Sequence, residues 1–237
     1  VIALLRLRQT DDAIYALLPR ELATTVATSL RRFVLRAKVD LQVATDLQVA
    51  WVAHTLTPIP ESAATEIVSF DYAPGRQVIA AHGATLRAMT GLSLERPHPE
   101  IENEWRLADV AAGLPQVFAA TSGSFVPQML NLDRLDAISF NKGCYTGQEI
   151  VARTQHLGRI KRRTLRYRLP PGPELAPLAG LSLTGQKVAE VVMSATREAV
   201  VELLAVTSLE ALGHTLLTED GREAVPVELP YGLGDGG

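Results

Sequence analysis

One stretch of the chain gathers side chains that could do chemistry: NKGCYTGQEIVART, residues 141–154. It holds the only cysteine, Cys144, between two glycines, and its charged residues are Lys142, Glu149 and Arg153. Glycine permits backbone angles that other residues avoid, so KGCYTG predicts a tight loop that presents the thiol. A lysine two positions away would favour the reactive thiolate, which makes Cys144 and Lys142 the candidate catalytic residues. The alternative is that Cys144 is a small buried hydrophobe, as free cysteines often are.

The low cysteine and histidine content limits the other chemistries. A single cysteine cannot form an internal disulfide, so a reducing, cytoplasmic setting is expected. Zinc and iron-sulfur sites need about three or four protein ligands, and the five histidines are not at close ligand spacing. We therefore expect no metal site made by this chain alone. A dyad of Cys144 with His156 competes with the simpler interpretation of His156 as a surface residue.

Glu149 and Arg153 are four residues apart, so on a helix they share a face. They could form a surface ion pair of little energetic weight. Alternatively, the carboxylate could accept two hydrogen bonds from a flat nitrogen heterocycle while nearby arginines hold an anionic tail. A bicyclic ring with a carboxylated tail would suit this pair.

Charge is unevenly distributed along a chain whose net charge is −3. Residues 141–168 contain one acid, Glu149, and eight basic residues, which gives this segment a net charge of eight minus one, or +7. The eight are Lys142, Arg153, Arg159, Lys161, Arg162, Arg163, Arg166 and Arg168. They predict a local basic surface, for which RNA is one possible anionic partner. Tyr167 is the one aromatic residue of residues 153–168, which is little for stacking on bases.

The elements that must position these residues follow from hydrophobic periodicity and turn signals. Helices are expected over residues 19–38, 84–92, 101–116 and 148–157. Strands are expected over residues 1–8, 13–18, 39–44, 68–73 and 78–83, which suggests an antiparallel sheet backed by helices, an α+β unit. Short β-rich runs with Gly, Pro or Asp turns follow residue 163 and predict a small barrel or sandwich.

Three domains are predicted: an α+β domain over residues 1–97, a segment with the cysteine loop over 98–162, and a β-barrel over 163–237. The two prolines of RPHPE mark a linker near the first boundary, and GLGDGG is expected to be a frayed tail. No apolar run approaches the roughly 20 residues of a membrane span, so no membrane association is expected. Since no Met starts the chain, we expect the natural protein to begin earlier.

The motif and its flanks closely resemble the YgfZ family of folate-binding proteins, relatives of the glycine-cleavage aminomethyltransferase. The resemblance rests on KGCYTGQEIVAR, HLGRIKRR, FVPQMLNLDRLDAISF and EWRLADVAAGLPQV, and it is strongest over residues 105–163. The family signature is filled by Lys142, Gly143, Cys144, Tyr145, Gly147, Gln148 and Glu149. Its upstream segment is matched by Trp105, Arg106, Phe125, Pro127 and Gln128. Residues 54–100 match no part of the family pattern.

The resemblance implies a three-domain cloverleaf, as in the aminomethyltransferase fold, around a cavity that binds tetrahydrofolate. The folate-binding residues are then expected to be Glu149, Arg153, Gln148, Tyr145, Gly143, Gly147, Trp105, Phe125 and Gln128. The chain begins at what would be the middle of the family's first strands, so cavity residues from the N-terminal segment cannot be assigned.

The implied function is that of a folate-dependent accessory protein for iron-sulfur protein assembly or repair, with effects on the thiolating enzymes that modify tRNA. Its partners would be iron-sulfur proteins or their assembly factors. The alternative is a folate-dependent aminomethyltransferase-like enzyme, which would need an acidic residue at the reacting amine. No such acid is assignable in this chain.

Overall fold

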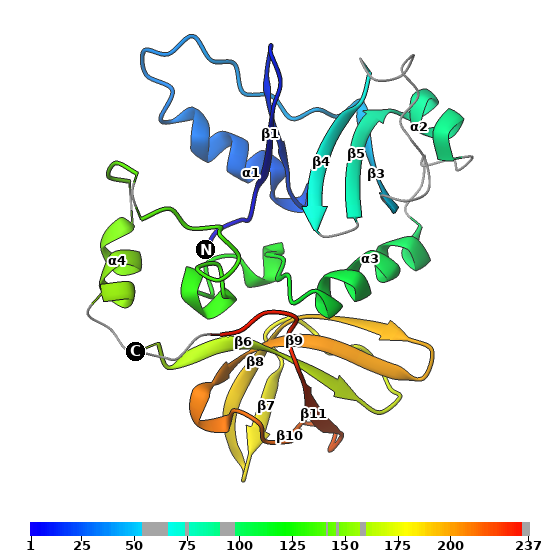
Figure 1. Ribbon diagram of the computed structural model, residues 1–237, viewed down its shortest axis with the longest axis vertical. Helices are drawn as coiled ribbons and strands as arrows, with labels where there is room; N and C mark the ends of the chain where they lie inside the picture. The colour runs from blue at the N-terminus through cyan, green and yellow to red at the C-terminus, as the bar shows by residue number, and fades with distance from the viewer. Residues whose placement is uncertain are drawn as a thin grey trace. The chain divides into compact units, whose positions relative to one another are not determined.

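The computed structural model describes residues 1–53, 66–73, 76–90, 98–140, 142–145, 147–156 and 160–233 (Figure 1). The chain divides into two compact units, one formed by Ala3–Glu102 and the other by Asn103–Gly237 together with Val1–Ile2. The predicted three-way division at residues 97 and 162 stays a prediction. Residues 91–92 of a predicted helix, residues 96–97 of the predicted linker and residues 234–237 of the predicted frayed tail lie outside the described residues.

The first unit combines a hairpin, two helices and a three-stranded sheet. Its elements are β1 (Arg6–Gln9), β2 (Ile14–Leu17), α1 (Arg20–Arg31), β3 (Leu47–Ala53), β4 (Val68–Ala73), β5 (Arg76–His82) and α2 (Gly83–Thr90). β1 and β2 pair antiparallel, and the other strands form an antiparallel sheet in the order β3-β5-β4 (Figure 1). The central strand β5 is buried from Val78 to Ala81, as expected for the middle of a sheet.

Helix α1 is shorter than the predicted helix over residues 19–38. Its buried face consists of Leu22, Val26 and Ala27, whereas Leu30 and Phe33, which would extend this face, are exposed, Phe33 by 71%. The Arg31 guanidinium donates to the carbonyl of Leu41, with Nε 3.0 Å from the oxygen, and so ties the following loop to the helix end. The helix therefore ends where its apolar face no longer meets a core.

Strand β3 corrects the prediction of a strand over residues 39–44. The sequence DLQVA occurs twice, at residues 40–44 and 46–50, and only the second copy is a strand. That copy continues into Trp51, and the strand pairs with β5 along all seven of its residues. Two identical pentapeptides have the same local propensity, so the available pairing partner decides which one is a strand.

The second unit begins with helical segments and ends in a barrel. Most of α3 (Pro99–Ala111) belongs to it, since the division between the units falls within this helix after Glu102. The 3₁₀ turns η2 (Ala119–Thr121) and η3 (Pro127–Leu130) and the helix α4 (Gln148–His156) follow. α3 ends at Ala111, short of the predicted end at residue 116, and Gly113 follows it with a φ of +66°, a left-handed conformation that suits glycine. A Cβ on Gly113 would also lie 2.7 Å from the Tyr231 ring, so both conformation and space require glycine there.

Six antiparallel strands close the predicted C-terminal barrel in the order β10-β11-β6-β9-β8-β7 (Figure 1). They are β6 (Arg162–Leu169), β7 (Gly180–Leu183), β8 (Gln186–Arg197), β9 (Val200–Ser208), β10 (Leu216–Leu217) and β11 (Glu223–Val227), with the 3₁₀ turn η4 (Leu209–Ala211) between β9 and β10. The barrel interior is filled by apolar side chains such as Leu165, Tyr167 and Leu203. The predicted mixture of helices and antiparallel strands, with a barrel at the C-terminal end, is confirmed. None of the described helices is long and apolar enough to cross a membrane.

The outer wall of the barrel carries an ion-pair cluster. Alternate residues of β6 face outward, and Arg166 and Arg168 both donate to Glu202 of β9, with Arg166 Nε at 3.2 Å and Arg168 Nη2 at 3.1 Å. The Glu202 side chain is only 3% exposed. Burial raises the pKa of this carboxyl, but the hydrogen bonds and positive charges of the two arginines outweigh burial and hold the pKa below its ordinary value.

We expect Glu202→Gln to lower the free energy of unfolding by about 2 kcal/mol at neutral pH, the size typical of hydrogen bonds to a charged group. Because the folded-state pKa lies below the unfolded-state value, this stabilisation is complete above the unfolded-state pKa and is lost as pH falls through the folded-state pKa. Urea denaturation near neutral pH and near pH 3 checks this: the gap between wild type and variant narrows in acid. A gap that widens in acid contradicts the assignment.

Candidate functional site

The thiol predicted by the motif lies on the surface. Cys144 is exposed, so the alternative of a buried hydrophobe is wrong. The loop turns into α4 through Gly147, whose φ is +87°, and the Gln148 amide donates to the Tyr145 carbonyl at 3.1 Å. A Cβ on Gly147 would meet nothing within 4 Å, so its backbone conformation is what requires glycine. Asn141 and Thr146 of the motif lie outside the described residues.

Lys142 has a defined contact within this loop. Its Nζ lies over the Tyr145 ring, 4.5 Å from the ring centre. A cation over an aromatic face is attracted by the ring's negative surface. Lys142 and Tyr145 therefore bracket Cys144, and the predicted role of Lys142 in activating the thiol stays a prediction.

The first turns of α4 present polar side chains to solvent. Val151 is buried, Gln148 is partly buried, and Glu149 and Arg153 are exposed. Among the described residues, neither Glu149 nor Arg153 forms an ion pair or a side-chain hydrogen bond, with the other or elsewhere. The surface ion pair weighed above is thus absent from the described contacts. A carboxylate and a guanidinium lie one helical turn apart and are available to a ligand.

Two predicted folate-binding residues upstream are buried instead of exposed to a ligand. Phe125 is 3% exposed, and Gln128 is fully buried in η3. The Gln128 side-chain Nε2 donates to the Val151 carbonyl of α4 at 2.8 Å. The structure therefore brings Gln128 to the helix that follows the cysteine loop. Trp105, by contrast, donates its indole N–H to Asp109 of its own helix, at 3.0 Å.

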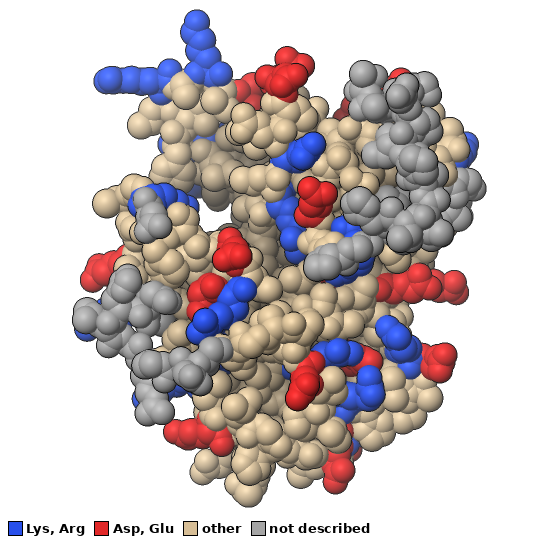
Figure 2. Space-filling model, in the orientation of Figure 1, with Lys and Arg blue, Asp and Glu red and all other residues tan. Residues whose placement is uncertain are grey.

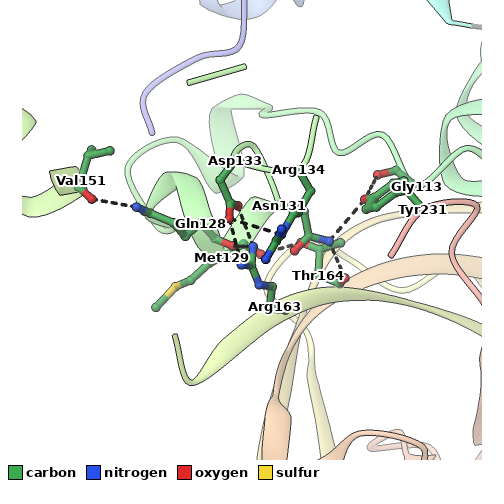
Figure 3. Close-up of polar contacts among 10 residues, drawn as sticks. All are labelled: Gly113, Gln128, Met129, Asn131, Asp133, Arg134, Val151, Arg163, Thr164 and Tyr231. Atoms are coloured by element: carbon green, nitrogen blue, oxygen red, sulfur yellow. Dashed lines mark hydrogen bonds and ion pairs between the residues drawn. The ribbon is translucent and has the colours of Figure 1, made fainter. Parts of the chain in front are cut away.

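A buried ion pair fixes the segment that carries Gln128. Arg163 binds Asp133 through both ends of its guanidinium, Nη1 to Oδ1 at 2.6 Å and Nη2 to Oδ2 at 2.9 Å (Figure 3). The two side chains are 4% and 6% exposed. Arg163 Nη1 also donates to the Gln128 carbonyl at 3.1 Å. The pair thus joins the first strand of the barrel to the segment around η3.

Three further hydrogen bonds hold the same segment, and a fourth extends them to Gly113 (Figure 3). Thr164 Oγ1 donates to the Met129 carbonyl at 2.8 Å, and Asn131 Nδ2 donates to the Thr164 carbonyl at 2.8 Å. The Tyr231 hydroxyl, 3.3 Å from Asn131 Nδ2, donates to the Gly113 carbonyl at 2.6 Å. Asn131 has a φ of 56°, in the left-handed region that asparagine tolerates better than most residues.

Sequence reasoning missed Asn131 and Asp133 and placed Arg163 on a basic surface. A signal for Arg163 was available, because it has the same parity along β6 as the interior residues Leu165 and Tyr167. Because successive side chains of a strand point to opposite faces, Arg163 is expected to point away from solvent, unlike its neighbour Arg162. The Asn131 and Asp133 contacts depend on tertiary structure, and no local pattern marks them.

The predicted basic surface is largely neutralised by partners from elsewhere in the chain. Arg162 pairs with Glu190 at 2.9 Å, and Arg166 and Arg168 pair with Glu202. Figure 2 shows acidic side chains interspersed with the basic ones on the face that it displays. Arg163 is buried, so it cannot contact RNA. The interpretation of residues 141–168 as one basic surface is therefore wrong for these four arginines.

Other parts of the segment keep their predicted character or lie outside the description. Lys142, Arg153 and Lys161 are exposed. Arg159 and the His156 side chain, hence the proposed dyad, lie outside the described residues. No group of three or more His, Cys, Asp or Glu residues within the described part of the chain could hold a metal ion.

Two open cavities are lined by described residues, and no residue of the motif lines either. One, of about 470 Å³, is bounded by Gln48, Gly83, Ala84, Arg87 and Ala88. The other, of about 300 Å³, is bounded by Leu175, Ala179, Gly180, Glu219 and Asp220 of the barrel unit. The surface with the richest chemistry is thus the exposed loop and the start of α4.

Fold and site define a class: a mixed α and β protein with a C-terminal six-stranded barrel and an exposed thiol on a glycine-flanked loop before a helix. Over 178 residues the chain is 34% identical to the tRNA-modifying protein YgfZ of Colwellia psychrerythraea. The match covers 68% of this chain and 54% of that protein, so the chain spans about half the length of its curated relative. No family model matches the chain. The chain belongs to the YgfZ family.

We expect Asp133→Ala to lower the free energy of unfolding by about 3–5 kcal/mol, because it leaves the buried Arg163 guanidinium without its carboxylate. Urea denaturation monitored by tryptophan fluorescence measures the loss. Asp220→Ala is the matched control, since Asp220 is an exposed carboxylate that binds an arginine, Arg222. The control should lose much less free energy of unfolding than Asp133→Ala, because the Asp220 carboxylate is exposed to solvent. Equal losses in both variants would show that the Asp133 pair has no special weight.

Proposed function

We propose that this chain is part of a tetrahydrofolate-binding accessory protein that supports the assembly or repair of iron-sulfur proteins. Its effect on tRNA modification, the activity for which its relative is named, would be indirect, through enzymes that thiolate tRNA. The observation that carries the proposal is the exposed Cys144 on a loop that leads into a helix whose Glu149 and Arg153 side chains are paired with no described residue.

Glu149 suits the ring of a folate. Its exposed carboxylate has acceptor oxygens that no described residue occupies, and a pterin ring offers adjacent N–H donors on one edge. Hydrogen bonds to an ionised acceptor are roughly twice as strong as neutral ones, so one carboxylate can orient a flat heterocycle. The residues present therefore fit the ligand that the family resemblance implies.

Arg153 suits the other end of the ligand. A folate ends in glutamate, and a guanidinium one turn beyond Glu149 offers a charged fork that can bind a carboxylate. Lys161 is also exposed and could extend the basic track for a polyglutamate tail. This assignment uses the basic residues that remain free after the barrel arginines are paired.

Buried Gln128 and Phe125 do not line an exposed surface in this structure, so their proposed role is support of the site. Gly143, Gly147, Tyr145 and Gln148 shape the loop and the helix start. In the proposal, the two units belong to a three-domain cloverleaf that encloses the folate, and Trp105 contributes to that enclosure.

Cys144 would act as a transfer or redox thiol beside the folate, activated by Lys142. A lone exposed thiol requires a reducing compartment to stay free, which agrees with a cytoplasmic location. Iron-sulfur proteins or their assembly factors would be its partners.

Titration of the whole protein with tetrahydrofolate tests the ligand. We expect Glu149→Ala to weaken binding about tenfold or more, since hydrogen bonds to a charged group contribute about 1.5–3 kcal/mol. Cys144→Ser should bind as wild type does. Glu190→Gln is the control, because Glu190 is a carboxylate on the barrel that pairs with Arg162 and Lys187. Unchanged affinity in Glu149→Ala, or no binding by wild type, overturns the assignment.

Complementation tests the thiol. In a strain that lacks the protein, wild type should restore the activity of iron-sulfur enzymes, and Cys144→Ala should restore far less. The variant should fold normally, because the thiol is exposed and makes no structural contact among the described residues. Restoration by Cys144→Ala to the wild-type level would exclude a role for the thiol.

A further inference from the structure

We propose that Gln128 is a positioning residue for α4 and the Cys144 loop, and that Arg163 and Asp133 hold Gln128 in the required place. The proposal goes beyond folate binding and does not depend on it. It assigns to the C-terminal barrel the task of orienting the motif.

Helix α4 depends on outside support. It has nine residues, shorter than the roughly 12–15 at which isolated helices become even marginally stable in water. Of its residues 148–153, only Val151 is buried. The hydrogen bond from Gln128 Nε2 to the Val151 carbonyl, at 2.8 Å, reaches the same position of the helix from outside. Val151 is thus both the buried apolar residue of this part of α4 and the acceptor of the hydrogen bond from Gln128.

Gln128 is fixed from its other side. Its own carbonyl accepts from Arg163 Nη1 at 3.1 Å and from the Asn131 amide at 3.2 Å. The Arg163 guanidinium is oriented by its two bonds to Asp133, so the third bond points at one carbonyl. A continuous chain of contacts therefore runs from the barrel strand β6 to α4 (Figure 3). It passes from Arg163, held by Asp133, to Gln128 and then to Val151.

A second observation singles out Gln128. Its Oε1 atom is buried and accepts no hydrogen bond from any described residue. A buried acceptor without a partner is unfavourable, and an apolar side chain of the same shape would avoid the cost. The presence of glutamine at position 128 is therefore explained by the hydrogen bond from its Nε2 to α4. An apolar side chain could not make this bond.

Gln128→Met tests the last step of the chain, because it keeps the length of the side chain and removes the donor. Hydrogen–deuterium exchange of the whole protein is followed over residues 142–156 and over β8 and β9. We expect exchange over 142–156 to accelerate about three- to tenfold, the range for one lost hydrogen bond, with β8 and β9 unchanged. Glu202→Gln is the control: it weakens the barrel and touches neither η3 nor α4. Equal acceleration in both variants, or none in Gln128→Met, overturns the proposal.

The double variant Arg163→Met, Asp133→Leu tests the earlier steps without a buried charge left behind. Replacing a buried ion pair by apolar residues is often neutral for stability, so the urea midpoint should stay near that of wild type. Exchange over 142–156 should nevertheless rise as in Gln128→Met. If the pair of Arg163 and Asp133 only stabilised the protein as a whole, exchange over residues 142–156 would rise only to the extent that the urea midpoint falls. A rise with an unchanged midpoint therefore indicates positioning.

Combining the variants tests whether the contacts act in series. If Arg163 and Asp133 act through Gln128, adding Gln128→Met to the double variant should produce little further acceleration. Independent contacts would instead multiply their effects. Multiplied effects would remove Arg163 and Asp133 from the proposal and leave Gln128 alone.

Discussion

The buried pair of Arg163 with Asp133 is the interaction on which this part of the structure depends. A guanidinium that is 4% exposed must have its donors satisfied, and it finds them in one carboxylate and one backbone carbonyl. All of these acceptors belong to the segment around η3. These contacts therefore join the first strand of the barrel to the segment of residues 127–133, and other parts of the site build on that joint.

This joint separates the residues that support the site from those that do its chemistry. Gln128 and Phe125 are buried and hold position, whereas Cys144, Glu149 and Arg153 are exposed. The same division explains the basic stretch: barrel arginines are paired with Glu190 and Glu202, whereas Lys142, Arg153 and Lys161 form no ion pair with a described residue. Residues that belong to one family pattern in the sequence thus fall into two groups in the structure. The buried ones support the site, and the exposed ones are available for its chemistry.

The sequence alone predicts elements whose signals are local. Alternation and turns predict the barrel, and Gly113 marks the end of α3. Features that depend on tertiary contacts cannot be predicted in this way. The two DLQVA copies have the same strand propensity, and only the second forms a strand because it pairs with β5. The exposed Cys144 was one of two alternatives left open by spacing. Counting charge along the chain places Arg163 on a basic surface. The structure buries it, because its acceptors Asp133 and Gln128 lie about thirty residues away in the sequence.

The central claim is that folate binds at the start of α4, on the surface that the joint supports. The most direct measurement is an NMR titration of the isotope-labelled whole protein with tetrahydrofolate. The account predicts that amide signals of residues 147–153 and the Gln128 side-chain amide signal shift together, with one saturable affinity. Saturable binding that shifts none of these signals, or no binding at all, would contradict the account.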